Sequence, residues 1–109
     1  MKGRILAGGG DWLLRGADGL SKLDVRKTFE TDDGALIDVR YIGLYKFDDA
    51  VTQRISNGGE SDFGDTLFKV QVLFETGDPR YAWLNETVAV GEGRETQSGV
   101  IYQLYALID

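Results

Sequence analysis

The stretch from Leu23 to Tyr45 constrains the fold more than any other part of the chain, because it has the residue pattern of a β-hairpin. Apolar and polar residues alternate on both sides of a short central segment; the apolar ones are Leu23, Val25 and Phe29 before it and Ile37, Val39 and Tyr41 after it. The segment between them is Thr31-Asp32-Asp33-Gly34, in which aspartates can bond their own backbone and Gly34 can take a positive φ. We therefore predict two long antiparallel strands joined by a tight turn.

Further short elements are predicted on both sides of this hairpin. Residues 2–7, 11–15, 66–75, 86–90 and 98–108 have strand patterns, 47–56 has helical spacing, and 80–84 forms one helical turn after Asp78-Pro79. Glycine-rich turns are expected at Gly8-Gly9-Gly10 and at Gly91-Glu92-Gly93. About seven strands with one inserted helix indicate a single all-β domain over residues 1–109, mainly antiparallel, forming a small barrel or a curled sheet.

The predicted last strand, residues 98–108, is apolar on both faces. Such a strand is usually covered on both sides, by the core and by something else. A second subunit is one candidate for that cover.

Composition excludes several functions. The net charge of -6, with no basic cluster longer than Arg26-Lys27, argues against nucleic acid and anionic membranes as partners. No apolar run is long enough for a membrane span or a signal peptide, and the lack of cysteine fits a reducing compartment, so we expect a cytoplasmic location. With no histidine and no carboxylate spacing of the EF-hand type, we expect neither a metal site nor a cofactor.

The polar face of the hairpin carries two arginines, Arg26 and Arg40, among aspartate, threonine and glutamate. The simpler interpretation makes this face the water side of the sheet, with opposite charges paired across strands. In the alternative it lines a barrel interior, where the two guanidinium groups receive an anionic or carbonyl-bearing ligand. The sequence favours the first interpretation without excluding the second.

Aromatic residues could wall a small-molecule pocket. Trp12, Tyr81 and Trp83 are large enough for this, with Glu75 and Asn85 close in sequence as polar orienting groups, although core aromatics would look the same. Our leading hypothesis is a cavity bounded by these aromatics and polarised by Arg26, Asp33, Arg40, Glu75 and Asn85.

Two alternatives to a pure binding protein stay open. The first is an isomerase, cyclase or lyase of small carbonyl compounds, with Glu75 or Asp33 as base and Tyr81 or an arginine as oxyanion partner. That enzyme needs a buried carboxylate with a raised pKa. The second is an oligomeric structural protein without a pocket.

Several motifs together resemble a known family. The matching segments are Gly8-Gly9-Gly10-Asp11-Trp12, Asp24-Val25-Arg26, Glu30-Thr31-Asp32-Asp33-Gly34-Ala35, Phe74-Glu75-Thr76, Tyr81-Ala82-Trp83-Leu84-Asn85 and Val90-Gly91. In this order they resemble the DUF3237 family, also called UPF0311. The resemblance implies a small bacterial β-barrel, calycin-like in general form, without an agreed activity.

The resemblance also implies a difference from typical members, which begin with about two further strands before the point that matches Lys2-Gly3-Arg4-Ile5-Leu6. Unpaired sheet edges are usually covered or paired in natural proteins. We therefore expect a homodimer or higher homo-oligomer, formed by strand pairing or swapping.

Overall fold

The computed structural model describes residues 3–6, 9–16, 18–46 and 48–107, and for Asp11 and Trp12 it describes the backbone alone. Within these ranges the elements are, in order, β1 (Gly3–Ile5), β2 (Gly10–Arg15), β3 (Leu20–Thr31), β4 (Leu36–Lys46), α1 (Asp49–Ser56), β5 (Phe68–Glu75), the 3-10 helix η1 (Pro79–Glu86), β6 (Val88–Thr96) and β7 (Gly99–Ala106). The predicted fold class, a mainly antiparallel curled sheet with one short α-helix, is confirmed.

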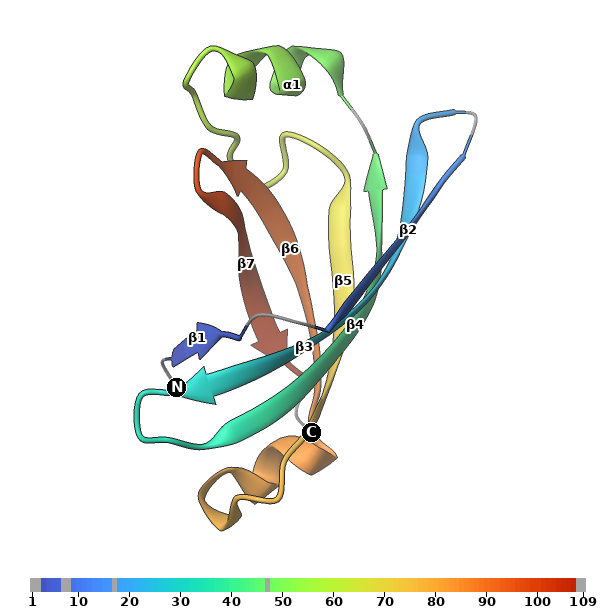
Figure 1. The fold of residues 1–109 in the computed structure, drawn as a ribbon. Helices are drawn as coiled ribbons and strands as arrows, with labels where there is room; N and C mark the ends of the chain where they lie inside the picture. Colours follow the sequence, from blue (N-terminus) through green and yellow to red (C-terminus); the bar gives the residue numbers. More distant parts are fainter. Residues whose placement is uncertain (1–2, 7–8, 17, 47, 108–109) are drawn as a thin grey trace.

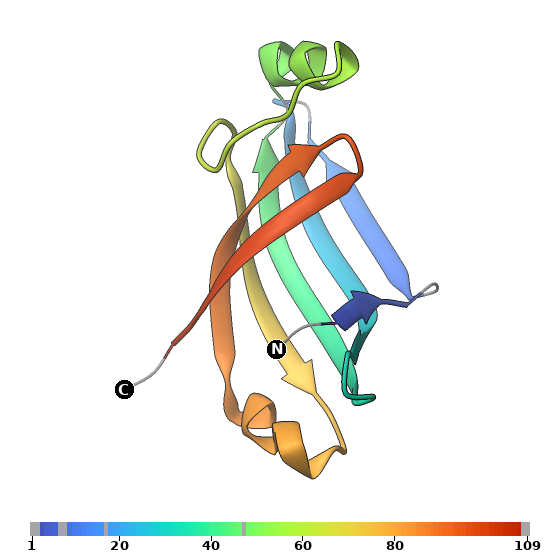
Figure 2. The same ribbon diagram turned by 90° about the vertical axis from the view of Figure 1, so that its left-hand side faces the viewer.

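All seven strands belong to one antiparallel sheet with the order β1-β3-β4-β5-β6-β7. On the edge of β3 away from β4, β1 pairs with one end of the strand and β2 with the other. The sheet curls into a half-barrel, with α1 at one end and η1 at the other (Figure 1). Figure 2 looks into its concave side, which β7 crosses diagonally.

The predicted hairpin is formed by β3 and β4. Gly34 adopts a φ of 88°, and the amide of Thr31 donates to the carbonyl oxygen of Ala35 over 2.9 Å. Phe29 stands opposite Ile37, so the alternation noted in the sequence falls in phase on the two strands. The turn chemistry and the pattern agree, which fixes the register.

The hydrophobic core lies on the concave side of the sheet. Its buried centre is formed by Phe68, Val70, Val72 and Ala89. Residues from the hairpin and from β7 pack against this centre, namely Leu23, Val39, Tyr41, Tyr45 and Tyr102. The apolar set of the hairpin therefore faces inward, and its polar set faces out from the convex side.

Both predicted helical segments are present, with η1 longer than the single turn predicted at residues 80–84, and an aspartate caps each of them. The Asp48 carboxylate accepts from the amide of Val51 over 3.0 Å, and the Asp78 carboxylate accepts from that of Arg80 over 2.9 Å. Each satisfies an amide that has no partner within its own helix. Val51 and Leu84 are buried, which anchors α1 and η1 to the two ends of the half-barrel.

The prediction of a turn at Gly91-Glu92-Gly93 is wrong, because β6 continues through these three residues to Thr96. Gly91 stands opposite Leu104, and a Cβ added to Gly93 would lie 2.9 Å from the ring of Phe68. Glycine is needed there because the carbonyl oxygen of Gln103 lies 2.2 Å from an added Cβ of Gly91 and the Phe68 ring fills the space at Gly93. The reversal of the chain follows at residues 97–98. The turn predicted at Gly8-Gly9-Gly10 lies partly outside the described residues.

Candidate functional site

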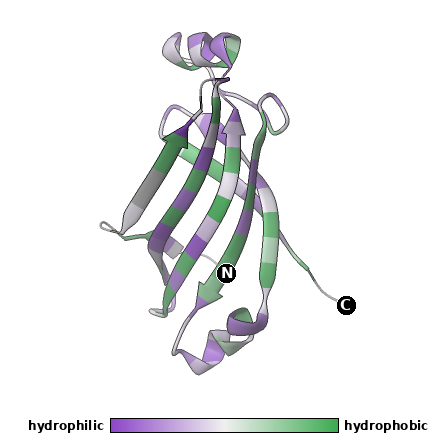
Figure 3. Ribbon diagram, turned by 90° about the vertical axis from the view of Figure 1, so that its right-hand side faces the viewer, coloured by the Kyte–Doolittle hydropathy of each residue, from purple (hydrophilic) through white to green (hydrophobic). Residues whose placement is uncertain are grey.

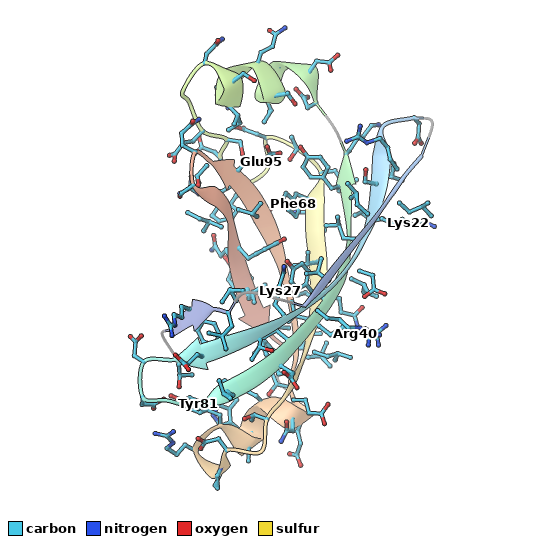
Figure 4. The ribbon with its side chains drawn as sticks, viewed as in Figure 1. Lys22, Lys27, Arg40, Phe68, Tyr81 and Glu95 are labelled. Carbon is cyan, nitrogen blue, oxygen red and sulfur yellow. The ribbon has the colours of Figure 1, made fainter. Side chains whose placement is uncertain are left out.

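The arginine face of the hairpin lies on the convex side of the sheet. Arg26 stands directly opposite Arg40, and Arg40 stands opposite Leu73 on β5. Figure 4 shows Arg40 projecting away from the concave side, on which Phe68 lies. The hypothesis that the two arginines line the barrel interior is therefore wrong, because the register places the hairpin's apolar set inside.

A depression of about 530 Å³ is formed on this convex face, and we call it the arginine depression. Its described lining includes four of the residues singled out in the sequence, namely Arg26, Arg40, Glu75 and Asn85, together with Thr28, Asp38 and Leu73. Neither Tyr81 nor Trp83 is among these described lining residues. The register of β3, β4 and β5 thus gathers residues that are far apart in the chain.

The arginine depression has a basic and an acidic side. Arg40 reaches Asp24 through an ion pair of 3.7 Å, and in the described part of the chain Arg26 makes no ion pair. On the other side Asp38 stands opposite Glu75 and accepts from the Thr28 hydroxyl over 3.2 Å. The surface can therefore receive an anionic group at one side and a hydrogen-bond donor at the other.

Asn85 acts as a clamp between η1 and the end of β5. Its side-chain oxygen accepts from the amide of Thr76 over 2.8 Å, and its side-chain nitrogen donates to the carbonyl oxygen of Thr76 over 2.9 Å. Both polar atoms are thus engaged with backbone. Asn85 shapes the wall of the depression, and one N–H and one oxygen lone pair of its amide are not used by these two bonds.

Asp33 and Tyr81 join the hairpin turn to η1, away from the arginine depression. The Tyr81 hydroxyl donates to the Asp33 carboxylate over 2.7 Å, and Arg80 lies 3.5 Å from the same carboxylate oxygen. Hydrogen bonds from Thr31 and Tyr81 hold the pKa of Asp33 below its usual value, and the bond to Asp33 raises the pKa of Tyr81. Arg80 also binds Asp78 over 2.8 Å, which completes a small ionic network.

The two tryptophans have separate positions. Trp83 lies in η1 with 56% of its surface exposed, and its carbonyl oxygen accepts from the Thr87 hydroxyl over 2.8 Å. Trp12 lies in β2, where its backbone pairs with that of Asp24 on β3. The side chain of Trp12 lies outside the described part of the chain. A shared aromatic wall with Tyr81 stays a prediction.

The concave face holds polar groups that the sequence reasoning did not single out. Lys27 stands opposite Val39, a core-packing residue, and so faces inward with Val25 and Phe29. The Tyr102 hydroxyl donates to that of Tyr41 over 3.2 Å. The signal for Lys27 was available, because it has the same strand parity as the apolar residues around it.

A second polar pair lies on the concave face toward α1. The Tyr45 hydroxyl donates to the Glu95 carboxylate. Burial, and after it this hydrogen bond, raise the pKa of Tyr45 well above its ordinary value. Edge-to-face contacts connect Tyr45 through Phe68 to Tyr102, with ring centroids 5.0 and 5.5 Å apart.

The convex face also carries an apolar groove of about 770 Å³, beside the arginine depression. Ile42, Leu44, Val90 and Tyr105 line it, with lysines and a glutamate at its rim. Figure 3 looks onto this side of the sheet, where hydrophilic and hydrophobic residues alternate along the long strands. The apolar groove and the arginine depression each lie between two neighbouring rows of side chains that point outward from the convex face.

The acidic segments of the chain have local roles. Asp65 pairs with Arg54 over 2.7 Å and accepts from the amide of Asp62, and these contacts lower its pKa. Across the described ranges no three potential metal-ligating side chains form a group that could hold an ion. In the same ranges no helix is long and apolar enough to cross a membrane.

Solved structures with the same fold define the class of this protein. A β-barrel-like protein of Acinetobacter baumannii superposes with a TM-score of 0.77 at 40% identity, covering 97% of this chain and 68% of that one. The conserved protein of unknown function RPA1785 of Rhodopseudomonas palustris gives 0.82 at 27% identity, covering 97% and 71%. The class is thus that of small β-barrel-like proteins.

The sequence comparison names the family. The model "Protein of unknown function (DUF3237)" matches residues 1–107, and the chain belongs to this family. The UPF0311 protein RPA1785 of Rhodopseudomonas palustris is 27% identical over 108 residues, covering 99% of this chain and 71% of that protein. A UPF0311 protein of Clostridium acetobutylicum is 27% identical over 105 residues, covering 96% and 66%.

Proposed function

We propose that this protein binds a small anionic or carbonyl-bearing molecule at the arginine depression. The observation that carries the proposal is the register of Arg26 and Arg40, which places the two arginine residues directly opposite each other on adjacent strands, and both residues line that depression. Like charges at directly opposite positions destabilise a sheet. An anion between them replaces this repulsion with charge-assisted hydrogen bonds.

The surroundings favour a ligand with two kinds of polar group. Asp38 and Glu75 on the acidic side accept hydrogen bonds, whereas the guanidinium groups only donate them. Leu73, which is 46% exposed and stands opposite Arg40, offers an apolar surface beside the arginines. Small hydroxy acids, phenolic acids and keto acids have this combination of groups.

A thermal-shift screen of small carboxylates, phenolic acids and keto acids tests the proposal. A ligand at 100 times its Kd adds about 2.7 kcal/mol to the free energy of unfolding. We expect a compound to raise the midpoint of the wild type and to have little effect on Arg40→Ala. Lys22→Ala, which removes an outward cation of the same strand pair at a distance from the depression, should keep the full shift.

Two results would count against this site. One is that no compound shifts the wild type, and the other is that Arg40→Ala responds as the wild type does.

No observation favours the enzymatic alternative. Glu75 is exposed, and the carboxylates whose pKa values are resolved as shifted, Asp33, Asp65 and Asp78, all have lowered values. A general base near neutral pH needs a raised value. A carboxylate base at Glu75 or Asp33 stays a prediction without support.

The strand β7 favours self-association as a second candidate role. It is the outermost strand beyond β6, and every one of its residues except Tyr102 is exposed. Apolar residues project from both faces, among them Ile101 at 43% and Leu104 at 41% exposure. Antiparallel pairing of two β7 edges about a two-fold axis would satisfy both edges at once.

Sedimentation velocity at micromolar concentration tests this assembly. We expect a dimer that Ile101→Lys shifts toward monomer, with Gln71→Lys on the exposed convex face of β5 as the control that keeps the dimer. A wild type that sediments only as a monomer would exclude it.

A further inference from the structure

We propose that the ligand of the arginine depression is a zwitterion, an α-amino acid with an apolar side chain. Its carboxylate binds the two arginines, and its ammonium group binds two carboxylates of the protein. This inference rests on the proposed function and names the class of molecule that fits the same site. The depression contains two neighbouring rows of like charges, one cationic and one anionic, and a simple anion neutralises only the first.

The strand register creates both rows. Arg26 on β3 stands opposite Arg40 on β4, and two residues further along β4, Asp38 stands opposite Glu75 on β5. All four side chains belong to exposed residues that line the depression. Like charges at directly opposite positions of a sheet are destabilising. Each row is therefore a place where a group of the opposite charge lowers the free energy.

The protein itself leaves these charges largely unneutralised. In the described part of the chain, Arg26 and Glu75 form no ion pair, and Asp38 accepts a hydrogen bond from the Thr28 hydroxyl over 3.2 Å. The one ion pair that Arg40 forms within that part is long, with 3.7 Å between nitrogen and oxygen, and 51% of its side chain is exposed. Donors on the cationic row and acceptors on the anionic row are thus available to a bound molecule.

The spacing of the rows matches an α-amino acid. Arg40 and Asp38 are two residues apart on one strand and point to the same face, so the rows lie about 7 Å from each other. The carboxylate and the ammonium group of an α-amino acid are attached to one carbon, and a hydrogen bond of about 2.8 Å extends from each. Such a molecule spans both rows, and both sets of hydrogen bonds are charge-assisted.

Leu73 gives a place for the side chain of the ligand. It is exposed beside the arginines, in the position opposite Arg40 on the same face. The depression, at about 530 Å³, has the size of an ordinary small-molecule site and leaves room for an aliphatic group next to the charged ones. We therefore choose L-leucine as the probe.

Three molecules with the same carbon skeleton test the proposal on the wild type. L-leucine, 2-hydroxy-4-methylpentanoate and 4-methyl-2-oxopentanoate share the carboxylate and the aliphatic group, and they differ in carrying an ammonium group, a hydroxyl or a carbonyl. By isothermal titration calorimetry at pH 7, we expect L-leucine to bind about tenfold more tightly than either acid. 6-Aminohexanoate, which carries the same two charges far apart, should bind more weakly than L-leucine.

Three variants locate the ammonium group. Glu75→Gln keeps the shape of the side chain and removes its charge, so the advantage of L-leucine should be lost while the hydroxy acid binds as before. Arg40→Ala should weaken the binding of all three molecules. Glu92→Gln is the matched control, because it neutralises another carboxylate of the convex face, one that pairs with Lys69 outside the depression. It should keep the full preference for L-leucine.

The outcomes separate this inference from the proposed function. If the hydroxy and keto acids bind through Arg40 as tightly as L-leucine does, the depression binds anions and the zwitterion is excluded. If neither L-leucine nor any compound of the thermal-shift screen binds the wild type, both proposals fail. If L-leucine keeps its advantage in Glu75→Gln, or binds no better than 6-aminohexanoate, the assignment of its ammonium group to the anionic row is overturned.

Discussion

The phenol of Tyr45 on β4 donates a hydrogen bond to the carboxylate of Glu95 on β6, over the strand β5 that separates them. The curl of the sheet favours this contact, because next-but-one strands lie about 10 Å apart in a flat sheet and the curl brings their concave side chains closer. The bond therefore reports directly on the half-barrel shape.

Removal of this hydrogen bond should destabilise the fold. Tyr45→Phe keeps the ring contact with Phe68 and leaves the half-buried Glu95 carboxylate without this donor. We expect a loss of about 1–2 kcal/mol in the free energy of unfolding, measured by urea denaturation. In the Glu95→Ala background, which has no acceptor for the Tyr45 hydroxyl, the same substitution should cost less, and an equal cost in both backgrounds would contradict the pairing.

The same pair predicts sensitivity to alkali. Burial and the bond to Glu95 raise the pKa of Tyr45 in the folded state. Its contribution to stability is fully present below the pKa of an unfolded tyrosine, about 10, and is lost as pH rises beyond it toward the folded value. Urea midpoints measured between pH 8 and pH 11 should fall less steeply in Tyr45→Phe than in the wild type; parallel curves would argue against the raised pKa.

The lowered pKa of Asp33 predicts that the stability of the fold decreases toward acid pH. Hydrogen bonds from Thr31 and Tyr81 lower its pKa, so its contribution to stability is present above the unfolded value of about 3.9 and is lost as pH falls through the folded value. Asp33→Asn should therefore flatten the urea midpoint between pH 5 and pH 2. The neighbouring substitution Asp32→Asn is the control, and it should leave the wild-type slope unchanged.

Gly43 should not tolerate a side chain. An added Cβ would overlap the carbonyl oxygen of Lys69 and lie 2.9 Å from Cγ1 of Val70, at a place where β4 and β5 approach closely. We expect Gly43→Ala to lower the free energy of unfolding by about 1–3 kcal/mol. Gly77→Ala is the matched control, because nothing lies within 4 Å of its added Cβ, and it should be neutral or slightly stabilising. Equal effects at both positions would contradict the close approach.

Asn85 should contribute to stability and not only to the shape of the depression. Asn85→Ala removes the two hydrogen bonds to the backbone of Thr76, and we expect a loss of about 1–2 kcal/mol by urea denaturation. Gln71→Ala, on the exposed face of β5, should change stability by less than about 0.5 kcal/mol. A neutral Asn85→Ala would mean that solvent replaces the clamp.

Much of the fold could be predicted from local patterns. The hairpin is specified by the alternation along residues 23–45 and by Gly34 in its turn. The starts of the two helices are specified by Asp48 and Asp78. Each of these signals acts through neighbours in the chain. The error at Gly91-Glu92-Gly93 arose because glycine has two uses, a turn or a close approach. Only the contacts with Leu104 and Phe68 show which one applies.

The sequence by itself determined that the hairpin has two chemically different faces, because side chains alternate along a strand whatever surrounds it. Only the tertiary structure decided which face is the interior, since that depends on which side of β3 and β4 packs against β5 and β7. This decision moved Arg26 and Arg40 outward and Lys27 inward. The tertiary structure also placed Asp33 and Tyr81 away from Arg26 and Arg40. The hydrogen bond that joins Tyr81 to Asp33 spans 48 positions of the chain, so no local pattern encodes it.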